Sequence, residues 1–376
     1  MTTLTRLTVM SFAIGFYVGC SPVNFGLDTS KCNDMDTTCV VENGKFKITE
    51  TITAGSGKVD ILIVNDNSAS MSFEQRRLAP RFQNFINNLD AKKIDYRIAM
   101  TTTDITSQGG KLIPFGSNPY LTPKVADRLA LFQTTIQRPE TRQCENFIAN
   151  WIASKGIGSI NTTAYQQQYA ANCPSGDERG VYAANTVIKT NPSSFLRPEA
   201  HFAIIFLSDE DERSGLYSSG GSALESMDQP ATLLSNVKSI LGNEKYNSLS
   251  VHAIVVRDST CLAQQNNQVL GDTPVEATRG LVQGSIGTVY LAFTKTSPAW
   301  GVSADICSEN YTGQLGEIQA RIENRLKDVI LRCDGAEGLT VSGSSVAYHL
   351  EGKTLKFDQY LAPGTSITLN YTCTNL

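Results

Sequence analysis

The stretch that decides the fold reads Asp60-Ile61-Leu62-Ile63-Val64-Asn65-Asp66-Asn67-Ser68-Ala69-Ser70-Met71. The uninterrupted apolar run at 61–64 predicts a strand that is covered on both faces, as in a parallel sheet. Asp66, Ser68 and Ser70 come after it at alternate positions, before a helix. Ligands of open α/β sheets bind at this end of the strands. One carboxylate and two hydroxyls at this spacing can converge on Mg²⁺, a hard cation that prefers oxygen ligands.

A second stretch, 201–207, in which His201 precedes the apolar run 202–207, predicts another buried strand of the same kind. It ends in a polar and acidic turn, 208–212, in which Asp209 is the first carboxylate. We expect Asp209 to lie at the same sheet edge as Asp66. Glu210, Asp211 and Glu212 are interpreted as solvated charge.

These two segments resemble the metal-ion-dependent adhesion site of the von Willebrand factor type A (vWA) family. The resemblance covers 58–332 and implies an α/β fold with a doubly wound, mostly parallel, Rossmann-like sheet. It also implies a bound Mg²⁺, or Mn²⁺ or Ca²⁺, held by Asp66, Ser68, Ser70 and Asp209. In this family one coordination position is left for an acidic side chain of a protein partner.

The middle metal loop departs from the family pattern. Where the family has a Gly-Gly-Thr loop, this chain has Ser175-Gly176-Asp177-Glu178-Arg179-Gly180, without a threonine. Glu178 or Asp177 could supply the missing oxygen, and Glu178 is the candidate metal ligand. Such a site would bind a cation more tightly and accept an acidic partner less readily. The alternative is solvated charge at a helix start, which the helix dipole stabilises.

Helices and strands alternate through 58–332, as expected for a mainly parallel sheet flanked by helices. Helices are predicted from the apolar spacing at 78–89, 125–136, 181–189, 230–241 and 315–330, and strands at 96–100, 251–256 and 289–293. Thr103 and Asp104 come after the strand at 96–100 and are therefore expected at the same sheet edge as the metal loop. We interpret them as polar residues that end this strand and cap the next segment. The alternative is that they are metal ligands. His252 alternates with apolar neighbours, which indicates a packed strand residue.

Residues 105–178 form an insertion at the predicted ligand-binding edge. Cys144 and Cys173 are expected to staple it. Long excursions at such edges commonly carry specificity, so one interpretation is a partner-recognition cap over the metal. The other interpretation is a disulfide-braced surface elaboration.

From residue 333 to 376 the apolar period changes to two, which predicts a small antiparallel β unit of short strands. About 40 residues are marginal for independent stability. A disulfide across the unit, Cys333–Cys373, would contribute about 2–4 kcal/mol. Residues 46–57 contain a further alternating segment, Phe46 to Ile52, which we predict pairs with this unit.

Residues 1–20 are typical of an export signal, with Arg6 preceding a short apolar run. Tyr17-Val18-Gly19-Cys20 resembles a bacterial lipoprotein processing site, in which Cys20 becomes the lipidated first residue. The alternative is an ordinary cleaved signal with a stray cysteine. A polar tether is predicted at 21–45. Eight cysteines remain besides Cys20, an even number that suits an oxidising compartment.

Proximity in the sequence suggests how these cysteines pair. The predicted disulfides are Cys32–Cys39, Cys144–Cys173, Cys261–Cys307 and Cys333–Cys373.

Composition and motifs favour a binding protein over an enzyme. The net charge of −4 gives no electrostatic case for nucleic acid. No nucleophile stands beside a base, and no Gly-x-Ser-x-Gly elbow occurs. The leading hypothesis is a lipid-anchored envelope protein, at the outer membrane, that binds a protein partner through a divalent cation. The alternative hypothesis is an envelope scaffold or assembly subunit with a vestigial metal site.

Overall fold

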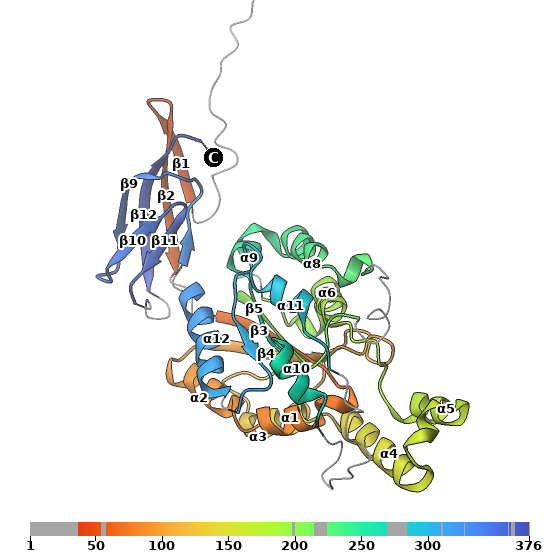
Figure 1. Ribbon diagram of the computed structural model, residues 1–376. Coiled ribbons are helices and arrows are strands. Elements are labelled where there is room, and N and C mark those ends of the chain that lie inside the picture. Colours follow the sequence, from red (N-terminus) through yellow and green to blue (C-terminus); the bar gives the residue numbers. More distant parts are fainter. Residues whose placement is uncertain are drawn as a thin grey trace, which may run out of the picture.

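The computed structural model describes residues 37–53, 58–197, 200–213, 224–268, 284–309, 311–326, 328–359, 361 and 365–375. These residues form a mixed α/β protein with one five-stranded parallel sheet and two smaller antiparallel sheets (Figure 1). None of the described helices combines the length and apolar character needed to span a bilayer.

The parallel sheet has the strand order β4-β3-β5-β6-β7. Its strands are β3 (Lys58–Asn65), β4 (Asp95–Thr102), β5 (His201–Ser208), β6 (Ser250–Val255) and β7 (Ser303–Asp305). In the register, Asn65 lies opposite Thr102 on one side and Leu207 on the other. The loops after β3, β4 and β5 therefore leave the sheet at one edge.

Helices cover both faces of this sheet, which explains the uninterrupted apolar runs. Ile61 and Ile63 of β3 pack into one core cluster, and Leu62 and Val64 pack into the other. The first cluster includes residues of α1 (Ser72–Leu78), α2 (Phe82–Ala91), α3 (Arg128–Ile136), α10 (Ser259–Gln265) and α12 (Tyr311–Leu326). The second includes residues of α6 (Gly180–Thr190), α8 (Pro230–Asn236) and α11 (Thr288–Phe293).

Shorter helical segments complete this domain. They are the 3₁₀ turns η1 (Ala69–Met71), η2 (Ile157–Asn161), η3 (Pro192–Ser194) and η4 (Ser226–Asp228), the π turn η5 (Val237–Leu241), and α9 (Gly242–Ser248).

The insertion is more helical than expected. Besides α3 it contains α4 (Pro139–Lys155) and α5 (Thr163–Asn172), which project from the body as an arm (Figure 1). The Cys144–Cys173 disulfide joins the two ends of this arm. Ile148 and Ile152 of α4 pack in one apolar cluster with Ala69, so the arm contacts the loop after β3.

The antiparallel unit joins both ends of the described chain. One sheet has the order β1-β2-β12-β9, and the other has the order β10-β11-β8. Their bounds are β1 (Thr37–Glu42), β2 (Lys45–Thr53), β8 (Asp328–Ile330), β9 (Glu337–Ser342), β10 (Tyr348–Glu351), β11 (Thr354–Phe357) and β12 (Ser366–Cys373). β2 pairs with β12 from Phe46 to Thr53, which is the pairing expected for 46–52.

Three expectations about elements were wrong. Residues 37–42, expected in a polar tether over 21–45, form strand β1, because backbone pairing with β2 extends the sheet. Residues 289–293 form helix α11 instead of a strand, and Tyr290 and Phe293, three positions apart, both pack into the core. The last helix ends at Leu326, since 328–330 pair with β11, so the β unit begins before residue 333.

Three disulfides agree with the proximity pairing of the cysteines. Cys144–Cys173, Cys261–Cys307 and Cys333–Cys373 have S–S distances of 1.97, 2.03 and 1.97 Å. Cys20 and Cys32, like the whole predicted signal at 1–20, lie outside the described residues. Lipidation of Cys20 and the pairing of Cys32 with Cys39 therefore stay predictions.

Candidate metal centre

The loops after β3 and β5 meet at the carboxyl edge of the parallel sheet. The Asp66 backbone N–H donates a 2.9 Å hydrogen bond to the Leu207 carbonyl, which keeps the β3 loop beside β5. Asp66 and Asp209 both lie at this edge, and both residues are fully buried. The register of the sheet thus brings together two carboxylates that are far apart in the sequence.

A chain of short contacts links the four predicted residues. The Ser68 N–H donates to Asp66 Oδ1 at 2.8 Å, and the Ser68 and Ser70 hydroxyls lie 2.8 Å apart. The Ser70 hydroxyl then donates to Asp209 Oδ1 at 3.0 Å. Asp66, Ser68, Ser70 and Asp209 therefore occupy one site, and each presents an oxygen to it.

Glu178 joins this site from the start of α6. It is fully buried and accepts a hydrogen bond at Oε2 from the Thr103 hydroxyl. Asp177, the other candidate of the middle loop, instead pairs with Arg213 at 3.2 Å. Of the two carboxylates that the sequence offered, Glu178 is thus the one held beside Asp66.

Two carboxylate oxygens of the site have no hydrogen-bond partner within the described part of the chain. They are Glu178 Oε1 and Asp209 Oδ2, and both atoms are buried. Leaving a buried acceptor unpaired costs about 1–3 kcal/mol, and more when it is charged. A divalent cation would satisfy both oxygens, and the complete donor set of carboxylates and hydroxyls is the hard-oxygen set that Mg²⁺, Mn²⁺ and Ca²⁺ take. The residues present therefore fit such an ion.

The electrostatics of the three carboxyl groups, those of Asp66, Glu178 and Asp209, also favour a bound cation. Burial raises the pKa of Asp66 above its ordinary value. Burial and, next, the charge of Asp66 raise the pKa values of Glu178 and Asp209 well above theirs. Like charges this close disfavour joint ionisation, and a bound cation reverses that penalty.

Two hydroxyls support these carboxylates: sequence reasoning placed Thr103 at this edge but assigned no role to Ser208. The Ser208 hydroxyl donates to Asp66 Oδ2 at 2.6 Å, and the Thr103 hydroxyl holds Glu178. Their signal was position alone, because both stand at the carboxyl ends of strands that neighbour β3. Asp104 instead accepts from the N–H groups of Thr106 and Ser107 at 3.0 and 3.2 Å, so it is a capping residue as expected.

Tyr169 of the arm also borders the site, although no sequence pattern pointed to it. Its ring packs in the apolar cluster that contains Ala69, between the two site serines. Burial, the neighbouring Tyr165 and the carboxylates of Glu178 and Glu210 raise its pKa. The arm therefore forms one wall beside the candidate metal centre.

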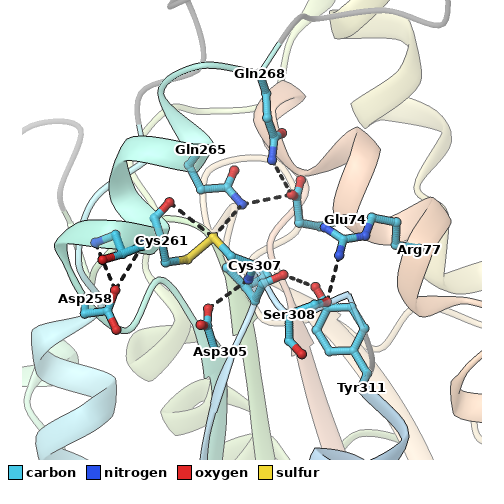
Figure 2. The surroundings of a disulfide bond; sticks show 12 residues. Glu74, Arg77, Asp258, Cys261, Gln265, Gln268, Asp305, Cys307, Ser308 and Tyr311 are labelled. Carbon is cyan, nitrogen blue, oxygen red and sulfur yellow. Dashed lines mark hydrogen bonds between the residues drawn. A yellow bond between two sulfur atoms is a disulfide. The ribbon is translucent and has the colours of Figure 1, made fainter.

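A second group of possible metal-ligand atoms includes two cysteines that form a disulfide with each other. Cys261, Asp305 and Cys307 have side-chain atoms within 4.8 Å of one another. The two sulfurs are bonded to each other, so neither is a thiolate that could bind a metal. Figure 2 shows this disulfide beside Glu74, whose Oε1 accepts hydrogen bonds from Gln265 and Gln268 at 2.9 Å each.

His252 has a structural role. It is buried in β6, where Nδ1 accepts a 3.1 Å hydrogen bond from the Val302 N–H. Nε2 lies 3.1 Å from the Ser250 hydroxyl and therefore carries the proton that it donates there. His252 is thus a packed strand residue, as the alternating pattern predicted, and both of its ring nitrogens form hydrogen bonds.

No protein-family model matches the chain, and no curated protein matches it. Among solved structures, the pilus adhesin SpaC of Lactobacillus rhamnosus GG in its open conformation is 12% identical over 90% of this chain, with a TM-score of 0.31. The type V pili tip protein Mfa5 of Porphyromonas gingivalis is 13% identical over 90%, with a TM-score of 0.27. The human COPII-coat protein Sec24c is 10% identical over 86%, with a TM-score of 0.34.

The chain spans 42% of the SpaC chain, 67% of the Mfa5 chain and 46% of the Sec24c chain. Likeness at these scores is too low to show a shared fold or activity.

Proposed function

We propose that this protein is an adhesion protein of the vWA type that binds a protein partner through a divalent cation. Mg²⁺, or Mn²⁺ or Ca²⁺, would be held by Asp66, Ser68, Ser70 and Asp209, with Glu178 in place of the threonine of the middle loop. An acidic side chain of the partner would take the remaining coordination position. The observation that carries this proposal is a pair of buried oxygens, on Glu178 and Asp209, that have no hydrogen-bond partner among the described residues. They lie beside the hydrogen-bonded chain from Asp66 to Asp209.

The exposure of the site residues favours a partner that approaches from one side. Asp66, Asp209 and Glu178 are fully buried, whereas Ser68 and Ser70 are half-buried. The carboxylates would thus hold the ion from below while its outer face lies beside the two hydroxyls. Mg²⁺ keeps several waters when few protein groups bind it, and a partner carboxylate can replace one of them.

The location we propose comes from the N-terminal sequence. A lipid on Cys20 would anchor the protein to the cell envelope, at the outer membrane, and the three described disulfides suit an oxidising compartment. We infer no catalytic activity, since the site presents a single cluster of oxygen ligands with no evident general base.

The test is thermal melting and then peptide binding. The melting temperature is compared in EDTA and in millimolar MgCl₂, MnCl₂ or CaCl₂, because a ligand of the native state stabilises it by RT ln(1 + [L]/Kd). Binding is then measured with a short peptide that carries one Asp and with its Asn counterpart. We expect Mg²⁺-dependent binding of the Asp peptide alone, and its loss in Asp66→Ala. Binding that resists EDTA contradicts the proposal.

A second candidate function is an envelope scaffold, and Glu178 favours it. Three carboxylates around one divalent cation leave a net negative charge, which opposes an acidic partner. In a scaffold the cation would be structural or the site vestigial, and the arm would make the contacts. A melting shift with Mg²⁺ but no binding of any acidic peptide favours the structural ion, and no shift with any of the three cations favours a vestigial site.

A further inference from the structure

A shallow groove lies along α4 on the projecting arm, and none of its lining residues is a candidate metal ligand. Its volume is about 790 Å³. The groove is lined by Pro139, Arg142, Gln143, Asn146, Phe147, Asn150, Trp151, Ser154 and Asn172. We propose that this groove binds a neutral oligosaccharide or polysaccharide chain, a function separate from the metal-dependent one.

The polar lining has the chemistry that uncharged sugars require. Gln143, Asn146 and Asn150 recur at spacings of three and four along α4, so they share one helix face, and all three are exposed. A carboxamide both donates and accepts hydrogen bonds, as a sugar hydroxyl does. Repeated amides on one face therefore match a row of hydroxyl groups without introducing a charge that must be desolvated.

Charge is sparse throughout this part of the arm. Between residues 143 and 172 the only charged side chains are those of Glu145 and Lys155. The Glu145 side chain is only 4% exposed and pairs with Arg76 at 3.4 Å. Arg142 is the single charged residue in the lining. An acidic polymer would thus meet little compensating charge, whereas a neutral chain needs none.

Aromatic rings supply the apolar part of the lining. The Phe147 and Trp151 ring centroids lie 5.9 Å apart, and Tyr165 lies 5.7 and 5.5 Å from them. Trp151 Nε1 donates a 2.7 Å hydrogen bond to the Ser159 hydroxyl, so the polar atom of the indole is satisfied within the arm. The half-buried rings of Phe147 and Trp151 can then pack against the C–H faces of sugar rings.

A disulfide and an apolar contact brace the arm that carries this surface. The Cys144–Cys173 disulfide closes it, and Ile148 and Ile152 fix α4 against the metal loop. Pre-organisation reduces the conformational entropy lost on binding, which matters for a shallow site. At a rise of about 1.5 Å per residue, the face from Gln143 to Ser154 is about 16 Å long, a length that accommodates several sugar rings in a row.

The experiment uses the full chain and defined neutral probes: cellotetraose, chitotetraose, maltotetraose and a linear mannotetraose, each titrated by NMR or calorimetry. We expect one of them to bind, and Asn146→Ala/Asn150→Ala to weaken binding about fivefold or more, because each of the two lost hydrogen bonds costs about 0.5–1.5 kcal/mol. Gln167→Ala/Gln168→Ala, which changes exposed amides of α5 outside the groove, is the matched control and should bind like wild type.

Adding EDTA distinguishes this proposal from the metal-dependent function. The lining contains no metal ligand of the candidate centre, so sugar binding should persist in EDTA even if acidic-peptide binding is absent or abolished. Failure of all four probes at millimolar concentration overturns the groove proposal. So does binding that EDTA removes, binding that the Asn146/Asn150 double variant leaves unchanged, or a groove that takes only peptides.

Discussion

Ser70 Oγ donates a 3.0 Å hydrogen bond to Asp209 Oδ1 across 139 residues of sequence. This contact exists because β3 and β5 are adjacent parallel strands whose carboxyl ends are in register. It closes the chain that begins at Asp66 and leaves Asp209 Oδ2 buried without a partner among the described residues. The predictions on metal binding depend on that arrangement.

Asp209→Asn should remove the stabilisation by cations without destabilising the metal-free protein. At 100 times Kd a bound ion adds about 2.7 kcal/mol to the free energy of unfolding of the wild type. In EDTA the variant should melt no lower than wild type, since one of three mutually repelling carboxylates is gone. Differential scanning calorimetry with and without millimolar MgCl₂ measures both effects. Asp127→Asn, at an exposed carboxylate, is the control and should retain the full Mg²⁺ shift.

Glu178→Thr should convert the middle loop to the residue type found in the vWA family. Removing one negative charge weakens Mg²⁺ binding, because the cation loses a carboxylate neighbour. The same change should strengthen binding of an Asp-containing peptide at saturating Mg²⁺, because a charge that repels the partner is removed. Calorimetric titrations with MgCl₂ and with the peptide measure the two affinities. If both affinities change in the same direction, Glu178 does not act as we propose.

Replacing both Cys333 and Cys373 by Ala should loosen the β unit selectively. The disulfide joins two cysteines that are 40 residues apart in the sequence. It should contribute about 2–4 kcal/mol to the free energy of unfolding. Amide hydrogen exchange in β2 and β12 should accelerate, while exchange in β3 and β5 stays slow. The Cys261→Ala/Cys307→Ala pair is the matched control and should leave β2 and β12 protected. Equal acceleration in all four strands would show that the protein unfolds as one unit.

Glu212→Gln should flatten the dependence of stability on pH. The interpretation of Glu212 as solvated charge was wrong: Glu212 is buried, because it accepts hydrogen bonds from the Val181 N–H and the Tyr290 hydroxyl at 2.8 Å each. Burial raises its pKa well above the ordinary value, with Asp228 adding repulsion. The folded state therefore holds this proton more tightly than the unfolded chain, so the free energy of unfolding falls as pH rises above about 5.

The pH effect is measured as a difference between the two proteins. Relative to Glu212→Gln, the wild type should lose up to about 1.4 kcal/mol per pH unit until the raised pKa is passed. Urea unfolding at three pH values between about 5 and 7 in EDTA gives this difference, in which the other carboxyl groups cancel. Parallel curves for the two proteins would contradict the assignment.

Much of the sheet was predictable because its strands carry local signals. The runs at 61–64 and 202–207 are apolar on both faces, and the structure buries them between two helical layers. The alternation at 46–52 likewise predicted pairing with the C-terminal unit, and Ile48 lies opposite Tyr371. Where local preference and packing disagreed, packing prevailed: Val289 to Phe293 has strand-forming residues but forms a helix, in which Tyr290 stacks on Phe206 at 4.8 Å.

The sequence by itself determined which residues could bind a hard cation, since Asp66, Ser68 and Ser70 come after one strand at alternate positions and Asp209 comes after another. Only the tertiary structure decided that Glu178, and not Asp177, lies beside Asp66, because Asp177 pairs with Arg213 and the Thr103 hydroxyl donates to Glu178. It also placed the arm beside that group through Ala69. The physical reason is range: the preference of a strand or a turn is set by neighbouring residues, whereas the partner of a buried charge is set by distant segments that packing brings together.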